Sequence, residues 1–277
     1  MENKMIKRIL TVQDISCLGQ CSITVALPII SALGVECAII PSAVLSTHTG
    51  SWSGYTFRDL TDDMPDIISH WVSYNEKFDG LYTGYIGNAK QFEILTEARN
   101  RLLKEGAPII TDPAMADNGV LYKGFDGAFV KEMAKYTAGS DFVVPNITEA
   151  AFMTGIEYKE KYDEEYVKRL VRGLKNLGAK EVILTGISYT PEKIGVCVSE
   201  GDKLLYHFED RVPESFHGTG DVFASVFAAS YINGYTALQA AARAAKFTRD
   251  AILCTDPKTH SYGVNFEAVL AGAGSPR

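Results

Sequence analysis

A short glycine-rich string, His217-Gly218-Thr219-Gly220-Asp221, is the part of this sequence best suited to chemistry. The apolar run over 222–229 follows it at once, so the string is predicted to open a helix. Glycines at a helix start leave backbone N–H groups uncovered, and together with the helix dipole these groups bind phosphate or a developing negative charge. A carboxylate in the first turn can take the proton of a substrate hydroxyl group. The string indicates either phosphoryl transfer to an alcohol or only a glycine-rich helix start that carries a stabilising charge.

Further polar residues follow the short β-branched runs that predict strands. In an open parallel sheet, ligands bind at the carboxyl ends of the strands, so these side chains are expected to meet at one edge. The Asp and Asn residues among them can equally be turn formers or helix caps, as Asp112 before Pro113 can. Glu149 can equally be a charge in a first helical turn, and Tyr85 a packed core aromatic. The residues concerned are Asp14, Tyr85, Asp112, Asn146, Glu149, Thr185 and Gly186.

Several competing site motifs are excluded by their spacing. No glycine is followed by lysine, so the Walker A loop is absent, and the dinucleotide pattern G-x-G-x-x-G fails because Phe223 occupies its last position. The segment 50–54 has Trp52 where a hydrolase nucleophile would stand. The five histidines include no H-E-x-x-H pair, which argues against a zinc hydrolase.

Composition limits the class of protein further. The 277 residues carry a formal net charge of −7, which argues against a nucleic-acid binder that neutralises phosphates. Five cysteines without a C-x-x-C pair predict reduced, mostly buried thiols. The N-terminal apolar stretch is too short for a signal peptide, and Pro28, Gly34 and Glu36 interrupt the apolar region 23–40, so we expect a cytoplasmic protein without a membrane partner.

The elements that position these residues alternate between strands and helices. This order predicts an α/β fold with a mostly parallel sheet, helices on both faces and one antiparallel edge hairpin, in a single domain over 1–277. Asn88 and Gln91 are expected to form a capping box at one helix start. The expected strands are 9–12, 37–40, 80–85, 108–111, 142–144 and 182–185, with the hairpin at 194–198 and 204–208; the expected helices are 64–72, 88–102, 166–177, 218–232 and 236–253.

Taken in order, several motifs resemble those of the ribokinase-like superfamily of ATP-dependent small-molecule kinases, and most closely the pyridoxal kinases. The resemblance implies a three-layer α/β/α sandwich that phosphorylates the 5′-hydroxymethyl group of vitamin B6 vitamers. A hydroxymethylpyrimidine kinase of thiamine synthesis is the nearest alternative, and a regulatory protein of this fold without turnover is a second. The segments that carry the resemblance are 45–50 (L-S-T-H-T-G), 83–85 (T-G-Y), 112–117 (D-P-A-M-A-D), 146–149 (N-I-T-E) and 218–221 (G-T-G-D).

The resemblance also implies a role for each site residue. Asp221 would be the general base, with Gly218 and Gly220 as the anion hole, and Asp112 and Glu149 would organise Mg²⁺. Family activity is accompanied by a monovalent cation, usually K⁺, and the family is typically homodimeric. The residues implied to contact ATP are Asp117, Tyr122, Asn146, Thr185, Gly186, Thr219 and Gly220; those implied to line the substrate pocket beside Asp221 are Asp14, His48, Thr49 and Tyr85.

Two positions depart from the pattern of many pyridoxal kinases. Asp14 stands where many have serine, at a position that touches the ring nitrogen. An ionised carboxylate only accepts hydrogen bonds, so Asp14 favours a protonated pyridinium or an amino group on the substrate. Val144 stands where many relatives have threonine, and its side chain cannot bind a cation.

Overall fold

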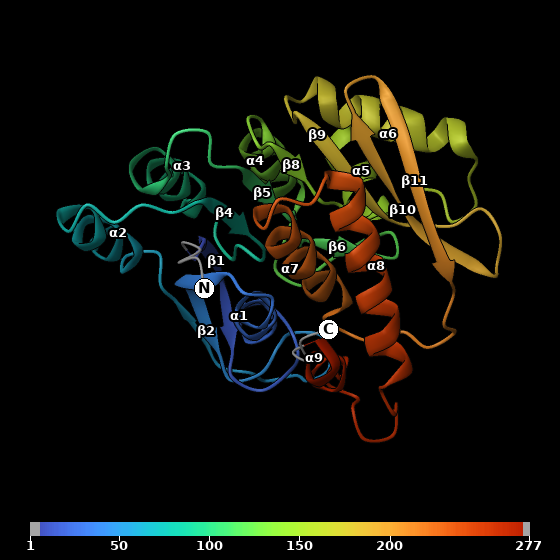
Figure 1. The fold of residues 1–277 in the computed structure, drawn as a ribbon, viewed down its shortest axis with the longest axis horizontal. Helices are drawn as coiled ribbons and strands as arrows, with labels where there is room; N and C mark the ends of the chain where they lie inside the picture. Colours follow the sequence, from blue (N-terminus) through green and yellow to red (C-terminus); the bar gives the residue numbers. More distant parts are fainter. Residues whose placement is uncertain (1–5, 274–277) are drawn as a thin grey trace, which may run out of the picture.

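A nine-stranded sheet forms the centre of the computed structural model, which describes residues 6–273. Its parallel part comprises β1 (Arg8–Ser16), β2 (Glu36–Leu45), β4 (Gly80–Thr83), β5 (Ile109–Thr111), β8 (Phe142–Val143) and β9 (Glu181–Ile187). The antiparallel hairpin of β10 (Lys193–Glu200) and β11 (Lys203–Asp210) forms one edge, and β3 (Phe57–Asp59) forms the other. The strand order is β11-β10-β9-β8-β5-β4-β1-β2-β3 (Figure 1).

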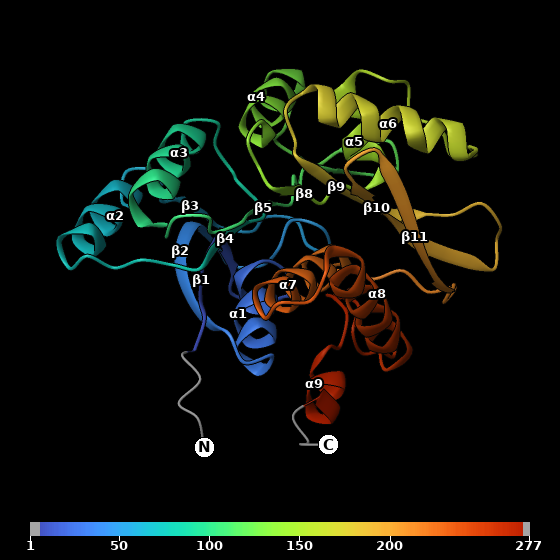
Figure 2. The ribbon, with the colours of Figure 1, turned by 45° about the horizontal axis from the view of Figure 1, so that its top comes forward.

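Helices cover both faces of this sheet, as Figure 2 shows. One face packs against α2 (Met64–Ser73), α3 (Gln91–Leu102), α4 (Gly127–Thr137), α5 (Ile147–Thr154) and α6 (Glu164–Asn176). The other packs against α1 (Ile23–Ala32), α7 (Thr219–Ile232) and α8 (Ala237–Leu253), with α9 (Glu267–Ala273) against α1 and α8. The expected α/β sandwich with an antiparallel edge hairpin is confirmed. Within 6–273, no helix is both long and apolar enough to cross a membrane.

Strands β1, β2 and β9 extend further than the apolar runs that predicted them, whereas β4, β5 and β8 are one or two residues shorter than predicted. Strand β1 continues to Ser16 because it pairs with β2 as far as Leu45, with a register shift between Gln13 and Ile15. Asp14 therefore lies within β1 rather than after it. Thr185 and Gly186 likewise lie within β9. The predicted order of elements is right, whereas these boundaries are wrong by two to four residues.

The capping box predicted at Asn88 is wrong. Helix α3 begins at Gln91 with Lys90 as its N-cap residue, and the Asn88 side chain instead accepts a hydrogen bond from the Lys90 N–H at 3.0 Å. The buried Gln91 amide donates to the Ser42 carbonyl oxygen at 2.9 Å and to the Thr61 hydroxyl at 3.0 Å. The Gln91 side chain thus binds residues that are distant in the sequence, instead of the backbone N–H that a capping box would have offered it.

The cysteines are all unpaired among the described residues, but the prediction that most are buried is wrong. Only Cys197 is buried, whereas Cys17 and Cys254 are exposed and Cys21 and Cys37 are intermediate. The exposed thiols lie in loop and helix-end positions, where no core covers them.

A small hairpin that the sequence analysis missed projects beside the sheet. Strands β6 (Ala116–Asp117) and β7 (Val120–Leu121) pair antiparallel across Asn118 and Gly119. Both turn residues have positive φ, 50° and 78°, which is the geometry of a type I′ turn. Asn-Gly is the strongest short-range sequence signal for such a hairpin, so this element could have been found.

Candidate active site

One cavity of about 550 Å³ and one of about 940 Å³ lie at opposite ends of the parallel strands. The larger one lies at the carboxyl ends, where α/β sheets bind ligands. Every residue to which the sequence analysis gave a role lines this larger cavity. The strands, the β6–β7 hairpin and the starts of α5 and α7 thus bring together side chains that are far apart in the chain.

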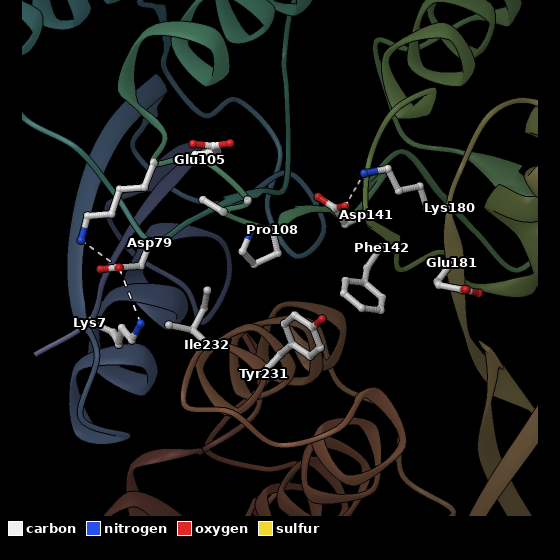
Figure 3. A pocket seen from close by; sticks show the side chains of 13 residues that line it. Lys7, Asp79, Glu105, Pro108, Asp141, Phe142, Lys180, Glu181, Tyr231 and Ile232 are labelled. Atoms are coloured by element: carbon white, nitrogen blue, oxygen red, sulfur yellow. Dashed lines mark hydrogen bonds and ion pairs between the residues drawn. The ribbon is translucent and has the colours of Figure 1, made fainter. Parts of the chain in front are cut away.

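The smaller cavity lies at the amino ends of β5, β8 and β9, beside the C-terminal turn of α7 (Figure 3). Most of its charged side chains pair with one another. Asp79 pairs with Lys104 at 2.8 Å and with Lys7 at 3.8 Å, and Asp141 pairs with Lys180 at 2.7 Å (Figure 3). We therefore place the chemistry in the larger cavity.

Two glycines at the start of α7 have different roles: Gly218 is required by close packing, and Gly220 leaves open space. Gly218 is the N-cap residue with φ 81°, and a Cβ atom there would lie 1.7 Å from the Gln20 carbonyl oxygen. A Cβ at Gly220 would meet no atom within 4 Å. Gly218 thus permits the close approach of the chain before α1, and Gly220 leaves room for a ligand beside the N-terminal turn, where the helix dipole favours an anion.

Asp221 lies in the first turn of α7 and lines the cavity. The pKa of its carboxyl group is raised to about 7, mainly by burial and in smaller part by the charge of Asp14, while the backbone of Ser22 opposes the shift. A carboxylate whose pKa is near neutrality is well matched to general base catalysis.

Asp112, Glu149 and Asp221 are close enough to influence one another. Burial raises the pKa of Asp112 well above its usual value, and the charges of Glu149 and Asp221 add to this shift. Burial also raises the pKa of Glu149 to about 7, against hydrogen bonds from three backbone N–H groups. Asp117 shows a smaller rise, again because of burial. A concentration of partly desolvated carboxylates of this kind is typical of a site that receives a cation.

Two of these predicted site residues are already committed to hydrogen bonds within the protein. Asn146 caps α5, because its side-chain oxygen accepts a hydrogen bond from the Glu149 N–H. The Glu149 carboxylate accepts in turn from the Asn146 N–H at 2.9 Å, so the two residues form a capping box. The other oxygen of Glu149 accepts from the Met115 N–H at 3.0 Å. The Asn146 amide donates to the Ala116 carbonyl oxygen at 2.8 Å. Their main effect in this structure is to hold the segment 112–117 against α5.

Asp14 is buried on β1, and its carboxylate accepts a hydrogen bond from Ser16, two residues along the same strand face, at 2.8 Å. Burial raises the pKa of Asp14, and the hydroxyl groups of Ser22 and Ser16 oppose the rise. Ser16 and Ser22 also line the cavity and were not predicted from the sequence; the D-x-S spacing on a strand could have indicated Ser16, but nothing local indicates Ser22.

His48 lines the cavity with both ring nitrogens occupied. The Gly50 N–H donates to Nδ1 at 3.0 Å, so the ring proton is on Nε2, which donates to the Tyr262 carbonyl oxygen at 2.8 Å. Burial lowers the pKa of His48, as expected for this neutral form. The ring holds the segment 48–50 against the loop that contains Tyr262, and it has no free nitrogen for a ligand.

The remaining residues with assigned roles lie on the rim of the cavity. Tyr85 is half-buried and packs against Phe125 with ring centroids 5.4 Å apart. Tyr122 follows the β6–β7 hairpin and is 38% exposed. The Thr185 hydroxyl donates to the Pro145 carbonyl oxygen at 3.2 Å, and Gly186 has φ 71°. Thr49 and Thr219 are intermediate in exposure.

Among the described residues, no group of three or more His, Cys, Asp or Glu side chains is arranged to hold a metal ion. A cation at Asp112 would thus need further ligands from outside the protein. Mg²⁺ commonly binds in this way, through one or two carboxylates together with substrate phosphates and water. The donor set fits a metal that arrives with a nucleotide.

Comparison with known proteins identifies relatives of the whole chain. The phosphomethylpyrimidine kinase family profile matches residues 27–265. A Bacteroides thetaiotaomicron protein described as a phosphomethylpyrimidine kinase, solved with pyridoxal, is 33% identical, with a TM-score of 0.91 over 98% of this chain and 97% of its own. Lactobacillus plantarum pyridoxal kinase is 28% identical, with a TM-score of 0.88 over 96% of both chains. Dictyostelium discoideum pyridoxal kinase is 26% identical over 80% of this chain and 77% of its own.

The close approach at Gly218 leads to a stability test. Gly218 and Gly34 share φ 81°, but a Cβ at Gly34 would meet nothing within 4 Å. We expect Gly34→Ala to lower the free energy of unfolding by about 1–2 kcal/mol, the cost of left-handed backbone for an L-residue. Gly218→Ala should lower it by clearly more, because the Gln20 backbone must also move. Urea denaturation compares the two variants, and equal losses would contradict the packing described for α7.

Proposed function

The chain belongs to the phosphomethylpyrimidine kinase family, and from this premise we propose that it transfers the γ-phosphoryl group of ATP to the 5′-hydroxymethyl group of vitamin B6 vitamers. The observation that carries the proposal is Asp221, a carboxylate with a pKa of about 7 beside the glycine-opened start of α7. The Bacteroides relative bound to pyridoxal supports the choice of substrate. The resemblance of the motifs to those of pyridoxal kinases agrees with the curated relatives.

Asp221 would act as the general base. Its carboxylate takes the proton of the hydroxymethyl group as the oxygen attacks the γ-phosphorus, and the bond between that phosphorus and the ADP oxygen breaks. The N–H groups at the start of α7, with Gly218 and Gly220, stabilise the negative charge on the moving phosphoryl group. Thr219, Asp117, Tyr122, Asn146, Thr185 and Gly186 are the proposed surroundings of the nucleotide.

Mg²⁺ would neutralise phosphate charge when it is bound with ATP, and Asp112 is the residue placed to hold it. Glu149 would contribute mainly by ordering the segment 112–117, because backbone N–H groups already occupy its oxygens. We propose K⁺ as an additional activator, with backbone carbonyl oxygens as its protein ligands, since Val144 offers only an apolar side chain. By family resemblance we also propose a cytoplasmic homodimer.

The vitamer ring would lie between Asp14, Thr49 and Tyr85, with the His48 loop as a wall of fixed shape. Asp14 is an acceptor whose carboxylate is held by the Ser16 hydroxyl group. It would thus bind a protonated ring nitrogen or an amino group. Tyr85 would stack on the ring, in line with the aromatic contact that it already makes to Phe125.

Hydroxymethylpyrimidine is the second candidate substrate, and one feature of the site favours it. An aminopyrimidine presents an amino group that can donate to the Asp14 carboxylate, as the protonated form of a B6 vitamer can. The family profile also carries the name of phosphomethylpyrimidine kinase. Both candidates need the same base and anion hole, so the ring pocket alone must distinguish them.

Removal of the proposed base tests the reaction. We expect the wild-type protein with Mg²⁺ and K⁺ to release ADP with pyridoxal, pyridoxamine or pyridoxine, and Asp221→Asn to lower kcat by about 100- to 10,000-fold, the usual contribution of a general base. Hydroxymethylpyrimidine is assayed in parallel. Asp62→Asn, an exposed carboxylate outside the cavity, is the matched control. No turnover with any of the four alcohols would refute the kinase proposal, and normal turnover by Asp221→Asn would remove the base.

The pH dependence of kcat/KM should follow the titration of Asp221. The base works only when deprotonated, and its pKa in the protein is about 7. The rate is thus expected to be constant above pH 8 and to fall about tenfold per pH unit well below pH 7. Steady-state rates from pH 5.5 to 9 with a saturating nucleotide measure this. A profile that stays flat down to pH 5.5 would contradict a base with a raised pKa.

The vitamer ranking tests Asp14. Replacement of Asp14 by serine removes the carboxylate and leaves a hydroxyl group that can donate to an unprotonated ring nitrogen. We expect Asp14→Ser to lower kcat/KM for pyridoxamine more than for pyridoxine, by about tenfold. The comparison uses substrate competition in one reaction mixture. An unchanged ranking would show that Asp14 does not select the substrate.

A further inference from the structure

The end of β9 contains a β-bulge that lines the larger cavity. Val196 of β10 pairs with Thr185, and the next pair along the ladder is Gly195 with Ile187. Gly186 is therefore one extra residue on β9, and its φ of 71° is the left-handed conformation that glycine adopts readily. A bulge leaves the extra residue without a partner in the ladder, and bulges are frequent beside active sites, where they redirect a strand.

The Tyr162 side chain supplies hydrogen-bond partners to this bulge. Its hydroxyl group donates to the Gly186 carbonyl oxygen at 3.4 Å and accepts from the Ser188 backbone N–H at 3.1 Å. Thr185, just before the bulge, is bonded to the segment after β8, since its N–H donates to the Pro145 carbonyl oxygen at 2.8 Å. The backbone is thus held by the main chain before the bulge and by one tyrosine hydroxyl group at and after it.

Aromatic packing fixes where this hydroxyl group points. Tyr162 directly precedes the N-cap residue of α6, and its ring packs against two other tyrosines. The ring centroids lie 5.4 Å from Tyr166 of α6 and 6.3 Å from Tyr189, which follows β9. Tyr162 lines the cavity together with Gly186 and Ser188. The segment before α6 is consequently joined to the end of β9 at the wall of the cavity.

We propose that Tyr162 is a positioning residue that holds the bulge of β9 in the shape that binds the nucleotide. This inference rests on the proposed function, in which Thr185 and Gly186 belong to the surroundings of ATP. Without the hydroxyl group, the bulge can relax, and the direction of the strand end changes with it. The proposed pocket for the ring is formed by other elements, so the effect should be confined to the nucleotide.

Removal of the hydroxyl group tests this role. We expect Tyr162→Phe to raise the KM for ATP about three- to tenfold, as for loss of one or two hydrogen bonds, while the KM for pyridoxal stays within twofold. Tyr166→Phe is the matched control, because the Tyr166 hydroxyl group donates to the Glu157 carbonyl oxygen at 2.9 Å and neither residue lines the cavity. It should leave both KM values within twofold. An equal rise of both KM values in Tyr162→Phe, or the same rise in Tyr166→Phe, would overturn the inference.

Amide hydrogen exchange reports on the contact itself. The Ser188 N–H loses its acceptor in Tyr162→Phe, so its exchange should become about tenfold faster. The Thr185 N–H keeps the Pro145 carbonyl oxygen and serves as the internal reference, with an expected change below threefold. Both rates are measured by NMR in the wild type and the variant. An unchanged rate at Ser188 would mean that Tyr162 does not hold the bulge.

Nucleotide binding without turnover separates this inference from the proposed function. Calorimetry with a non-hydrolysable ATP analogue and Mg²⁺ compares the wild type with Tyr162→Phe. If the wild type binds the analogue but phosphorylates none of the four alcohols, the proposed reaction fails, yet weaker binding by Tyr162→Phe would still support the inference. If turnover is normal and the two proteins bind the analogue equally well, the proposed function stands and the inference fails.

Discussion

The arrangement of the site depends on the burial of carboxylates at one edge of a parallel sheet. Asp14, Asp112, Glu149 and Asp221 all have raised pKa values, and burial is the largest cause in each case. A carboxyl group with a folded pKa above its unfolded value binds more protons in the native state, so its ionisation works against folding. For Glu149 and Asp221 this loss of stability develops as the pH rises from about 4 to about 7. The two hydrophobic cores on either side of the sheet must supply the compensating stability.

Backbone N–H groups, rather than basic side chains, oppose much of this burial. Glu149 accepts from the N–H groups of Met115 and Asn146, and the backbone of Ser22 opposes the rise in the pKa of Asp221. Such donors cannot adjust by rotation of a side chain, because the strands and helices fix where they point. The positions of the carboxylates are consequently a property of the fold, which is the preorganisation that electrostatic catalysis requires. It also fits an acidic protein that neutralises phosphate through a helix start and a bound cation.

The sequence could predict those parts of the site that depend on local order. Asp221 follows two glycines at a helix start, and Asp112 follows a short strand, so both their elements and their common edge follow from the pattern. The occupied ring nitrogens of His48 could not be foreseen, since Tyr262 lies 214 residues away along the chain. Alternation and capping patterns carry no information about such distant partners.

The proposed pocket for the ring and the proposed site of phosphoryl transfer are not independent of each other. The charge of Asp14 raises the pKa of Asp221, and both carboxylates line the same cavity. A substrate that brings a positive charge to Asp14 would remove part of this repulsion and make Asp221 easier to ionise. A cationic ring would then favour the active form of the base as well as binding, whereas a neutral ring would gain only the binding contacts. Discrimination between flat heteroaromatic alcohols would on this account appear in kcat as well as in KM, because the group that selects the ring also influences the group that takes the proton.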